Sequence, residues 1–113
     1  MDVEVTVAKY LANACSIACY VVIPTERPEE FAFVEITSTS GSRFKRDYNL
    51  AVQAWAKTRK RACELASKLA DAAQDLDEET NIFAPSAEPA YSYPDPNSKS
   101  ARYQFVLHLT VCE

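Results

Sequence analysis

The sequence contains very little glycine, and this scarcity excludes a large class of binding sites. Only one of its 113 residues is glycine, so neither the GxGxxG pattern of dinucleotide-binding folds nor the GxxxxGK[ST] phosphate loop can be written. Histidine and tryptophan also occur only once each. No uninterrupted run of about 18 apolar residues is present, so the sequence predicts no membrane-spanning helix.

Metal-ligating residues are also few and poorly spaced. The four cysteines are Cys15, Cys19, Cys63 and Cys112, no CxxC pair occurs, and His108 is the sole histidine. Cys15 and Cys19 are spaced for one helical face, which leaves a metal pair conceivable, but the set is a weak match to a zinc site. We therefore expect reduced, mostly buried cysteines, no metal and no cofactor.

Nothing in the sequence indicates a catalytic centre. A single histidine defines no Ser-His-Asp or Cys-His arrangement. The acids at 75–79 are more typical of a solvated helix end than of a paired-carboxylate site. The formal net charge of −4 argues against a general nucleic-acid binder, and residues 1–11 carry acids where a secretory signal carries bases. We expect no enzyme, no catalytic residues and no secretory signal.

Residues 47–79 carry the clearest structural pattern. Leu50, Val52 and Ala54 recur at every second position, which predicts a strand. Apolar residues then recur at intervals of three and four, which predicts a helix of roughly 20 residues with Thr58 as its N-cap. The residues on this helical stripe are Ala62, Leu65, Ala66, Leu69, Ala73 and Leu76.

The remaining patterns complete one domain over residues 1–113. They predict a helix over 3–14, a buried strand over 17–23 and a strand over 31–38. A loop over 38–42 holds Gly41, where we expect positive φ, and it joins the second and third strands into a long hairpin. An edge strand over 90–93 and a last strand over 102–112 follow. The predicted fold is a two-layer α+β domain, with a small, mostly antiparallel sheet and both helices on one face.

Charge on the long predicted helix opposes the helix dipole. Bases stand at its start and acids at its end, whereas the dipole favours the reverse. One hypothesis is that the basic end of one subunit, around Arg59 and Arg61, meets an acidic surface of a neighbour in a head-to-tail ring. The alternative is that screened surface charge costs too little to be selected against.

The predicted sheet has a second face that no helix covers. Trp55, Phe33 and Val106 fall on it by strand alternation. Because large apolar side chains are rarely left in water, either the proline-rich segment of the same chain or a neighbouring subunit is expected to cover them.

Several stretches together resemble a known family. They are PTERPEEFAFVEI (24–36), the Ser/Gly tip, LAVQAWA (50–56) before an alanine-rich helix, YPDP (93–96) and RYQFVLHL (102–109). This order resembles the tail terminator proteins of long-tailed (siphovirus-type) phages, particularly those infecting actinobacteria.

The resemblance implies a structural virion protein at the head-proximal end of the tail, assembled in the host cytoplasm. Such proteins form a hexameric ring that caps the tail tube, ends polymerisation of the tube protein and presents the surface for head-tail joining. Their partners are copies of themselves, the tail tube protein and a head-completion or connector protein; DNA passes through the lumen without sequence-specific binding, and no membrane is involved. The family has no cofactor and no active-site residues.

The contact regions of the family are loops and the sheet edge. They match the tip at Gly41, Arg43, Lys45 and Arg46 and the proline-rich loop at Asp95 and Asn97. With Trp55, Arg59 and Arg61 these form the predicted interface with other copies or the tube. Two alternatives remain: another phage neck or head-completion protein, and a small ferredoxin-like ligand-binding module, which would need a pocket with convergent polar groups.

Overall fold

Two long strands form the centre of the molecule. The computed structural model describes residues 1–113, in which β3 (Lys45–Ala56) and β6 (Ala101–Cys112) pair antiparallel over their full length. Twelve residues at about 3.3 Å each span roughly 40 Å, which matches the longest dimension of the molecule, 42 Å. The strand pair therefore sets the length of the whole domain.

Four shorter strands extend this pair into a six-stranded sheet. They are β1 (Ala18–Tyr20), β2 (Phe31–Gly41), β4 (Ile82–Ala87) and β5 (Tyr91–Ser92). The order across the sheet is β1-β2-β3-β6-β4, and β5 pairs with β6 as well. Only the β1–β2 pairing is parallel.

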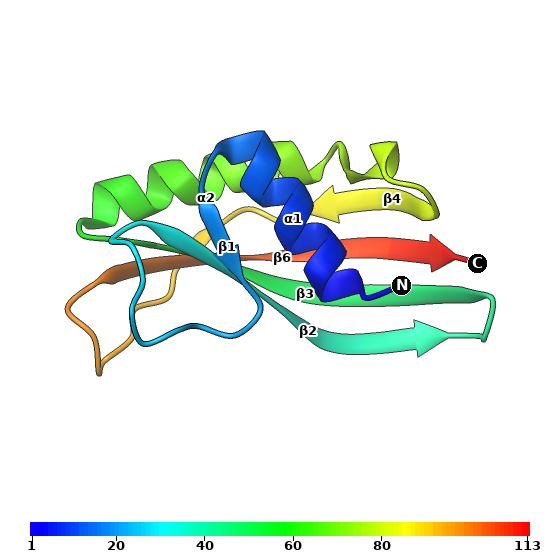
Figure 1. Ribbon diagram of the computed structural model, residues 1–113, viewed down its shortest axis with the longest axis horizontal. Coiled ribbons are helices and arrows are strands. Elements are labelled where there is room, and N and C mark those ends of the chain that lie inside the picture. The colour runs from blue at the N-terminus through cyan, green and yellow to red at the C-terminus, as the bar shows by residue number, and fades with distance from the viewer.

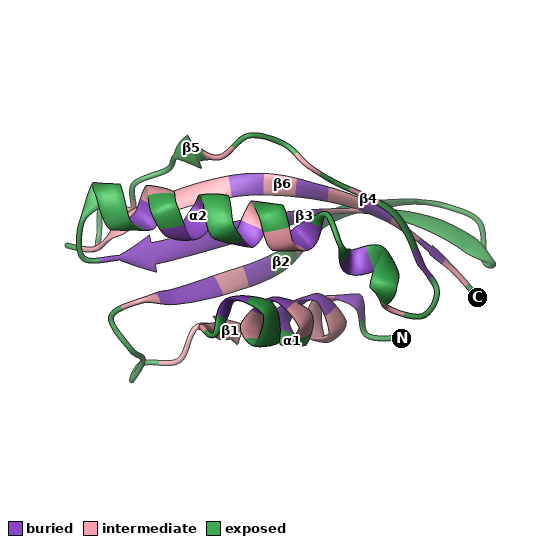
Figure 2. Ribbon diagram, turned by 90° about the horizontal axis from the view of Figure 1, so that it is seen from above, coloured by how far each residue is buried: buried purple, intermediate pink, exposed green.

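Both helices, α1 (Val3–Cys15) and α2 (Arg59–Ala73), pack on one face of the sheet (Figures 1 and 2). The Thr58 side chain accepts a hydrogen bond from the backbone N–H of Arg61, as a helix N-cap does. Between the layers lies a core of 22 buried residues, including the helical stripe of α2 and the inward face of β6. Each fully buried Leu contributes about 1.5–3 kcal/mol. The predicted two-layer α+β architecture is confirmed.

The helix of roughly 20 residues predicted after Thr58 is too long. Helix α2 ends at Ala73, and the chain tightens through i→i+3 hydrogen bonds into the short 3₁₀ helix η1 (Leu76–Glu78). The acids in this stretch oppose the helix dipole, which disfavours further α-helix. Leu76 is nevertheless fully buried, so the apolar stripe continues after the helix has ended.

Two strands differ from the predictions in their extent, and a third strand was not predicted. The segment 17–23 was expected to be a buried strand, but β1 is a three-residue, half-buried edge strand, and Val22 is 78% exposed. No strand pairs with the outer edge of β1. Residues 38–41, expected in a loop, continue β2. Strand β4 was not predicted because it contains Pro85, which an edge strand tolerates.

The turn between β2 and β3 depends on Gly41. Its φ is +106°, as the sequence predicted, and a Cβ atom there would lie 2.5 Å from the carbonyl oxygen of Lys45. Ser42 closes the turn, since its backbone N–H donates to the same oxygen at 2.8 Å.

No helix of the molecule has both the length and the apolar character needed to cross a membrane.

We expect Gly41→Ala to lower the free energy of unfolding by about 1–3 kcal/mol, because the new Cβ meets the backbone at a conformation that L-residues avoid. Chemical denaturation measures the change. Ser40→Ala is the matched control, since Ser40 is an exposed strand neighbour without positive φ. Equal stability of the two variants would show that the turn tolerates a side chain at Gly41.

Candidate functional site

The predicted interface residues lie at the two ends of the long sheet. Gly41, Arg43, Lys45 and Arg46 are all exposed at the tip of the β2–β3 hairpin. Trp55 lies one residue before the end of β3, roughly 33 Å from Lys45, and α2 starts close to it. The predicted residues therefore form two separate groups, one at each end of the molecule, rather than one site.

The hairpin tip is basic and carries one exposed aromatic side chain. Phe44 is 67% exposed, and the guanidinium of Arg43 lies 5.7 Å from the centre of its ring. Neither Arg43, Lys45 nor Arg46 forms a salt bridge. The tip thus presents unpaired positive charge to its surroundings.

At the start of α2, one predicted contact residue is already occupied within the chain. Arg61 binds Glu30 at 2.6 Å and Glu64 at 3.3 Å. The hydrogen bond from Arg61 holds the pKa of Glu30 below its usual range. Arg59, in contrast, is exposed and forms no salt bridge. Arg61 is therefore committed to its own chain, while Arg59 is available to a partner.

The sequence left two possible covers for Trp55, a segment of its own chain or a neighbouring subunit. In the structure, its own chain covers it. The side chain is only 4% exposed, and its ring stacks on Phe31 with centroids 5.2 Å apart and planes at 19°. The guanidinium of Arg27, from the loop before β2, lies 5.7 Å from the Trp55 ring centre, and that of Arg102 lies 5.0 Å from it. The cover comes from this loop and the start of β6, with the proline-rich segment behind Arg102.

A chain of hydrogen bonds runs across this face of the sheet from β3 to β5. The indole N–H of Trp55 donates to Gln53 Oε1 at 3.1 Å, and Gln53 Nε2 donates to Gln104 Oε1 at 3.0 Å. Gln104 Nε2 then donates to the Tyr91 hydroxyl at 2.6 Å. Gln53 is the one buried polar side chain of the molecule, and each of its bonds satisfies a group that would otherwise be costly to bury.

The proline-rich loop is attached to the same end of the molecule. Arg102 donates through Nε to the Tyr93 carbonyl at 2.6 Å, and its guanidinium lies 4.6 Å from the Tyr93 ring centre. Within the loop, Asp95 Oδ1 accepts from the backbone N–H of Asn97 at 3.0 Å, which forms a side-chain-closed turn. Asp95 and Asn97 are thus close to Trp55 through Arg102, whereas the hairpin tip is not.

The last turn of α2 and the segment that follows it are strongly acidic. The Tyr10 hydroxyl contacts the carbonyl of Asp75 at 3.0 Å and Glu78 Oε2 at 3.4 Å. Burial, followed by the charges of Glu78 and Asp75, raises the pKa of Tyr10. Five carboxylates here take part in no salt bridge. They are Asp71, Asp75, Asp77, Glu78 and Glu79, which we call the acidic end.

The cysteines and the histidine do not form a site. All four cysteines are free, but only Cys15 is fully buried, whereas most were expected to be. His108 is half-buried on the outer sheet face, with Asn49 at Nδ1 and Glu88 3.5 Å from Nε2. No group of three His, Cys, Asp or Glu side chains is arranged to hold a metal ion.

Sequence analysis missed Arg27 and Arg102. The position of Arg102 was readable, because it shares its strand face with Gln104 and pairs in register with Trp55. Arg27 gave no signal, since it lies in the loop 21–30, whose path over the sheet follows no periodic pattern.

We expect Gln53→Leu to lower the free energy of unfolding by about 1–3 kcal/mol, because it leaves the buried Trp55 N–H and the Oε1 atom of Gln104 without partners. Chemical denaturation followed by circular dichroism measures the change. Gln74→Leu makes the same substitution at an exposed helix end and should change stability by less than about 0.5 kcal/mol. A loss no greater than that of the control would contradict the role assigned to Gln53.

Burial, with a smaller contribution from Cys15, raises the pKa of Cys19 from its ordinary value of 9.0 to about 12. Between these two pH values the thiol is ionised in the unfolded chain and neutral in the folded one. The free energy of unfolding should therefore fall as the pH rises from about 9 to 12, and it should fall less steeply in Cys19→Ala. Denaturation of both proteins across this range tests the prediction, and parallel pH profiles would refute it.

Comparison of the sequence with protein-family models gave no match, and comparison with curated proteins gave none either. The resemblance to tail terminators therefore remains a prediction from the sequence.

Proposed function

We propose that this chain is a structural virion protein that assembles head to tail into a ring on the tail tube of a long-tailed phage. In this role it ends polymerisation of the tube protein and provides the surface for head-tail joining. The proposed partners are further copies of the chain, the tube protein and a head-completion or connector protein, with DNA passing through the lumen.

The observation that carries the proposal is the separation of unpaired charge along α2. At the start of α2, Lys57, Arg59 and Lys60 are exposed and free of salt bridges. At the other end of the helix lie the five unpaired carboxylates of the acidic end. Two different surfaces that complement one another favour a heterologous contact, and such contacts close into rings when the rotation between copies permits.

The order of sequence motifs supports the more specific part of the proposal. It resembles tail terminators over nearly the whole chain. That resemblance implies an α+β subunit with a sheet and two helices, and this chain has both elements. Six copies of the 12.6 kDa chain would form a ring of roughly 76 kDa.

The identity of the target is tested by mixing the protein with purified tail tubes of the phage and imaging them by negative stain. We expect rings at one end of each tube and an arrest of further tube growth. Binding along the tube wall, or a stable monomer that binds a small ligand and leaves tubes bare, would contradict the proposal.

The role of the charge separation is tested by reversing the charges at the start of α2 and at the acidic end. We expect Arg59→Glu with Lys60→Glu to abolish assembly at low salt, while stability stays equal or rises by a few tenths of a kcal/mol because acids are favoured at a helix start. Adding Asp77→Lys and Glu79→Lys to the same chain should restore assembly. Sedimentation velocity measures the size of the particles, and unfolding curves measure stability. Assembly that is indifferent to the first pair of changes would rule out this contact.

A further inference from the structure

Two arginines share one aromatic platform and have no acidic partner. The guanidinium of Arg27 lies 5.2 Å from the Phe31 ring centre as well as 5.7 Å from that of Trp55, and Arg102 lies over Trp55 and Tyr93. Neither arginine forms a salt bridge, although Glu26 and Glu29 stand on the same loop as Arg27. Both guanidinium groups lie within 5.7 Å of the Trp55 ring centre, and each would attract a bound anion.

The chain holds both guanidinium groups in position before any ligand arrives. Arg27 donates through Nη1 to the Pro24 carbonyl at 3.2 Å, and Arg102 donates to the carbonyls of Tyr93 and Pro94. Each arginine has five N–H donors, so most of them remain unused. Fixed guanidinium forks lose little side-chain entropy when they bind, and their geometry matches a carboxylate.

We propose that the guanidinium groups of Arg27 and Arg102, held beside the buried Trp55 ring, form a binding site for carboxylates of the acidic end of a second copy of this chain. This contact rests on the proposed head-to-tail assembly. The guanidinium groups of Arg27 and Arg102 would make it. It differs from the interface predicted by sequence, because it assigns the contact to Arg27 and Arg102 rather than to Arg61.

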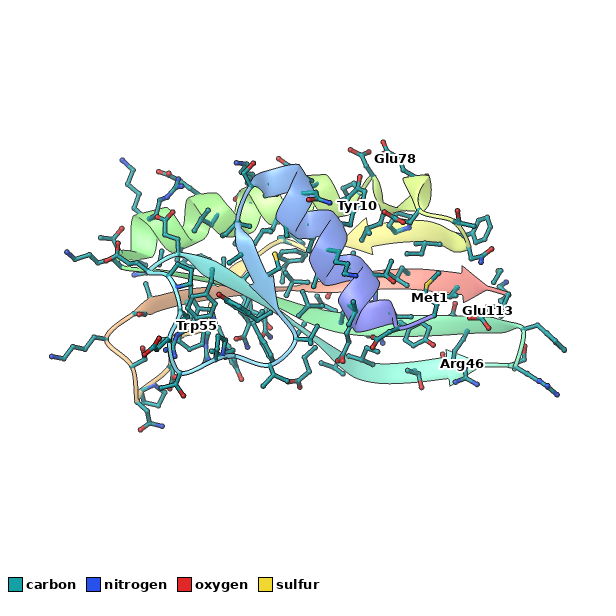
Figure 3. The ribbon with its side chains drawn as sticks, viewed as in Figure 1. Met1, Tyr10, Arg46, Trp55, Glu78 and Glu113 are labelled. Carbon is teal, nitrogen blue, oxygen red and sulfur yellow. The ribbon has the colours of Figure 1, made fainter.

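The acidic end of the same chain lies too far away to fill this site. Helix α2, with 15 residues, separates the two regions by roughly 22 Å at 1.5 Å per residue. Trp55 and Glu78 accordingly lie well apart along the molecule in Figure 3. A second copy can supply the carboxylates, because the acidic end of the first copy cannot reach Arg27 and Arg102.

A carboxylate fits the site better than a nucleic-acid backbone does. Nucleic-acid surfaces are usually stripes of many basic residues on a basic domain. This chain instead has a net charge of −4, and the site holds only two arginines. The chain itself carries five unpaired carboxylates, so the complementary group is present on every copy.

The test uses two directional versions of the full chain. The acceptor keeps Trp55, Arg27 and Arg102 but carries Asp77→Asn, Glu78→Gln and Glu79→Gln. The donor keeps its acids but carries Arg27→Gln, Trp55→Phe and Arg102→Gln. Because Trp55 is the only tryptophan, the donor has no tryptophan fluorescence, and the signal reports only on the proposed site. Circular dichroism first establishes that both versions are folded.

We expect a saturable change in Trp55 fluorescence when donor is added to acceptor, weakened by raising the salt concentration. Neutralising the three acids of the donor should weaken the response by roughly tenfold or more. An acceptor with Arg43→Gln and Arg46→Gln, which removes bases from the distant hairpin tip, should respond like the parent acceptor.

Three results would overturn the inference. They are the absence of any response at about 1 mM donor, a response unchanged by neutralising the acids, and tighter binding of a poly(dT) oligonucleotide than of the donor. Rings on tube ends together with any of these results would leave the proposed function standing without this contact. A donor response without ring formation on tubes would leave the contact standing and refute the proposed function.

Discussion

The full-length pairing of β3 with β6 is the constraint on which the rest of the structure depends. It joins residues 45–56 to residues 101–112, and every other element is added to one face, edge or end of this pair. Its inward face supplies much of the core under both helices, and its outward face carries the hydrogen bonds from Trp55 to Gln104. Because the pair is about 40 Å long, it holds two functional ends apart in one small domain.

This length gives the molecule a polarity that a rounder domain of the same size would lack. At one end, Trp55 and the two arginines beside it lie close to the basic start of α2. At the other end of α2 lies the acidic end, and the basic hairpin tip projects beyond the body of the sheet (Figure 1). The charges that could neutralise one another lie on separate surfaces, so the chain itself leaves them unpaired. Arg61, which does find carboxylates in its own chain, shows the contrasting case.

The parts of the fold that follow a strong period were predictable. The alternation through Leu50, Val52 and Ala54, the stripe on α2 and the N-cap at Thr58 all depend on local geometry, and so did the positive φ of Gly41. Predictions failed where the position of a segment in the fold, and not its sequence pattern, decides its structure. The apolar segment 17–23 became a short edge strand because its partner β2 pairs with it over only three residues. The proline-containing β4 was missed because edge strands tolerate proline.

The candidate site divides in the same way. Strand parity placed Trp55 on the face opposite the helices, and the reversed charge of the long helix was visible in the order of its residues. The sequence did not show which basic side chains lack a salt bridge, because the pairing of Arg61 with Glu30 joins residues 31 positions apart. Arg27 reaches Trp55 through a loop, so no sequence spacing indicates their contact.

The central claim is that unlike ends of different copies meet, and zero-length cross-linking tests it most directly. Chains grown with ¹⁴N and ¹⁵N are mixed, assembled and treated with a carbodiimide, which joins amines to carboxylates in contact, and mixed-isotope peptides are then identified by mass spectrometry. The account predicts mixed-isotope links between the carboxylates at Asp77, Glu78 or Glu79 and the amines of Lys57 or Lys60. Mixed-isotope links from these carboxylates only to Lys45 of the hairpin tip, or links only within single chains, would contradict it.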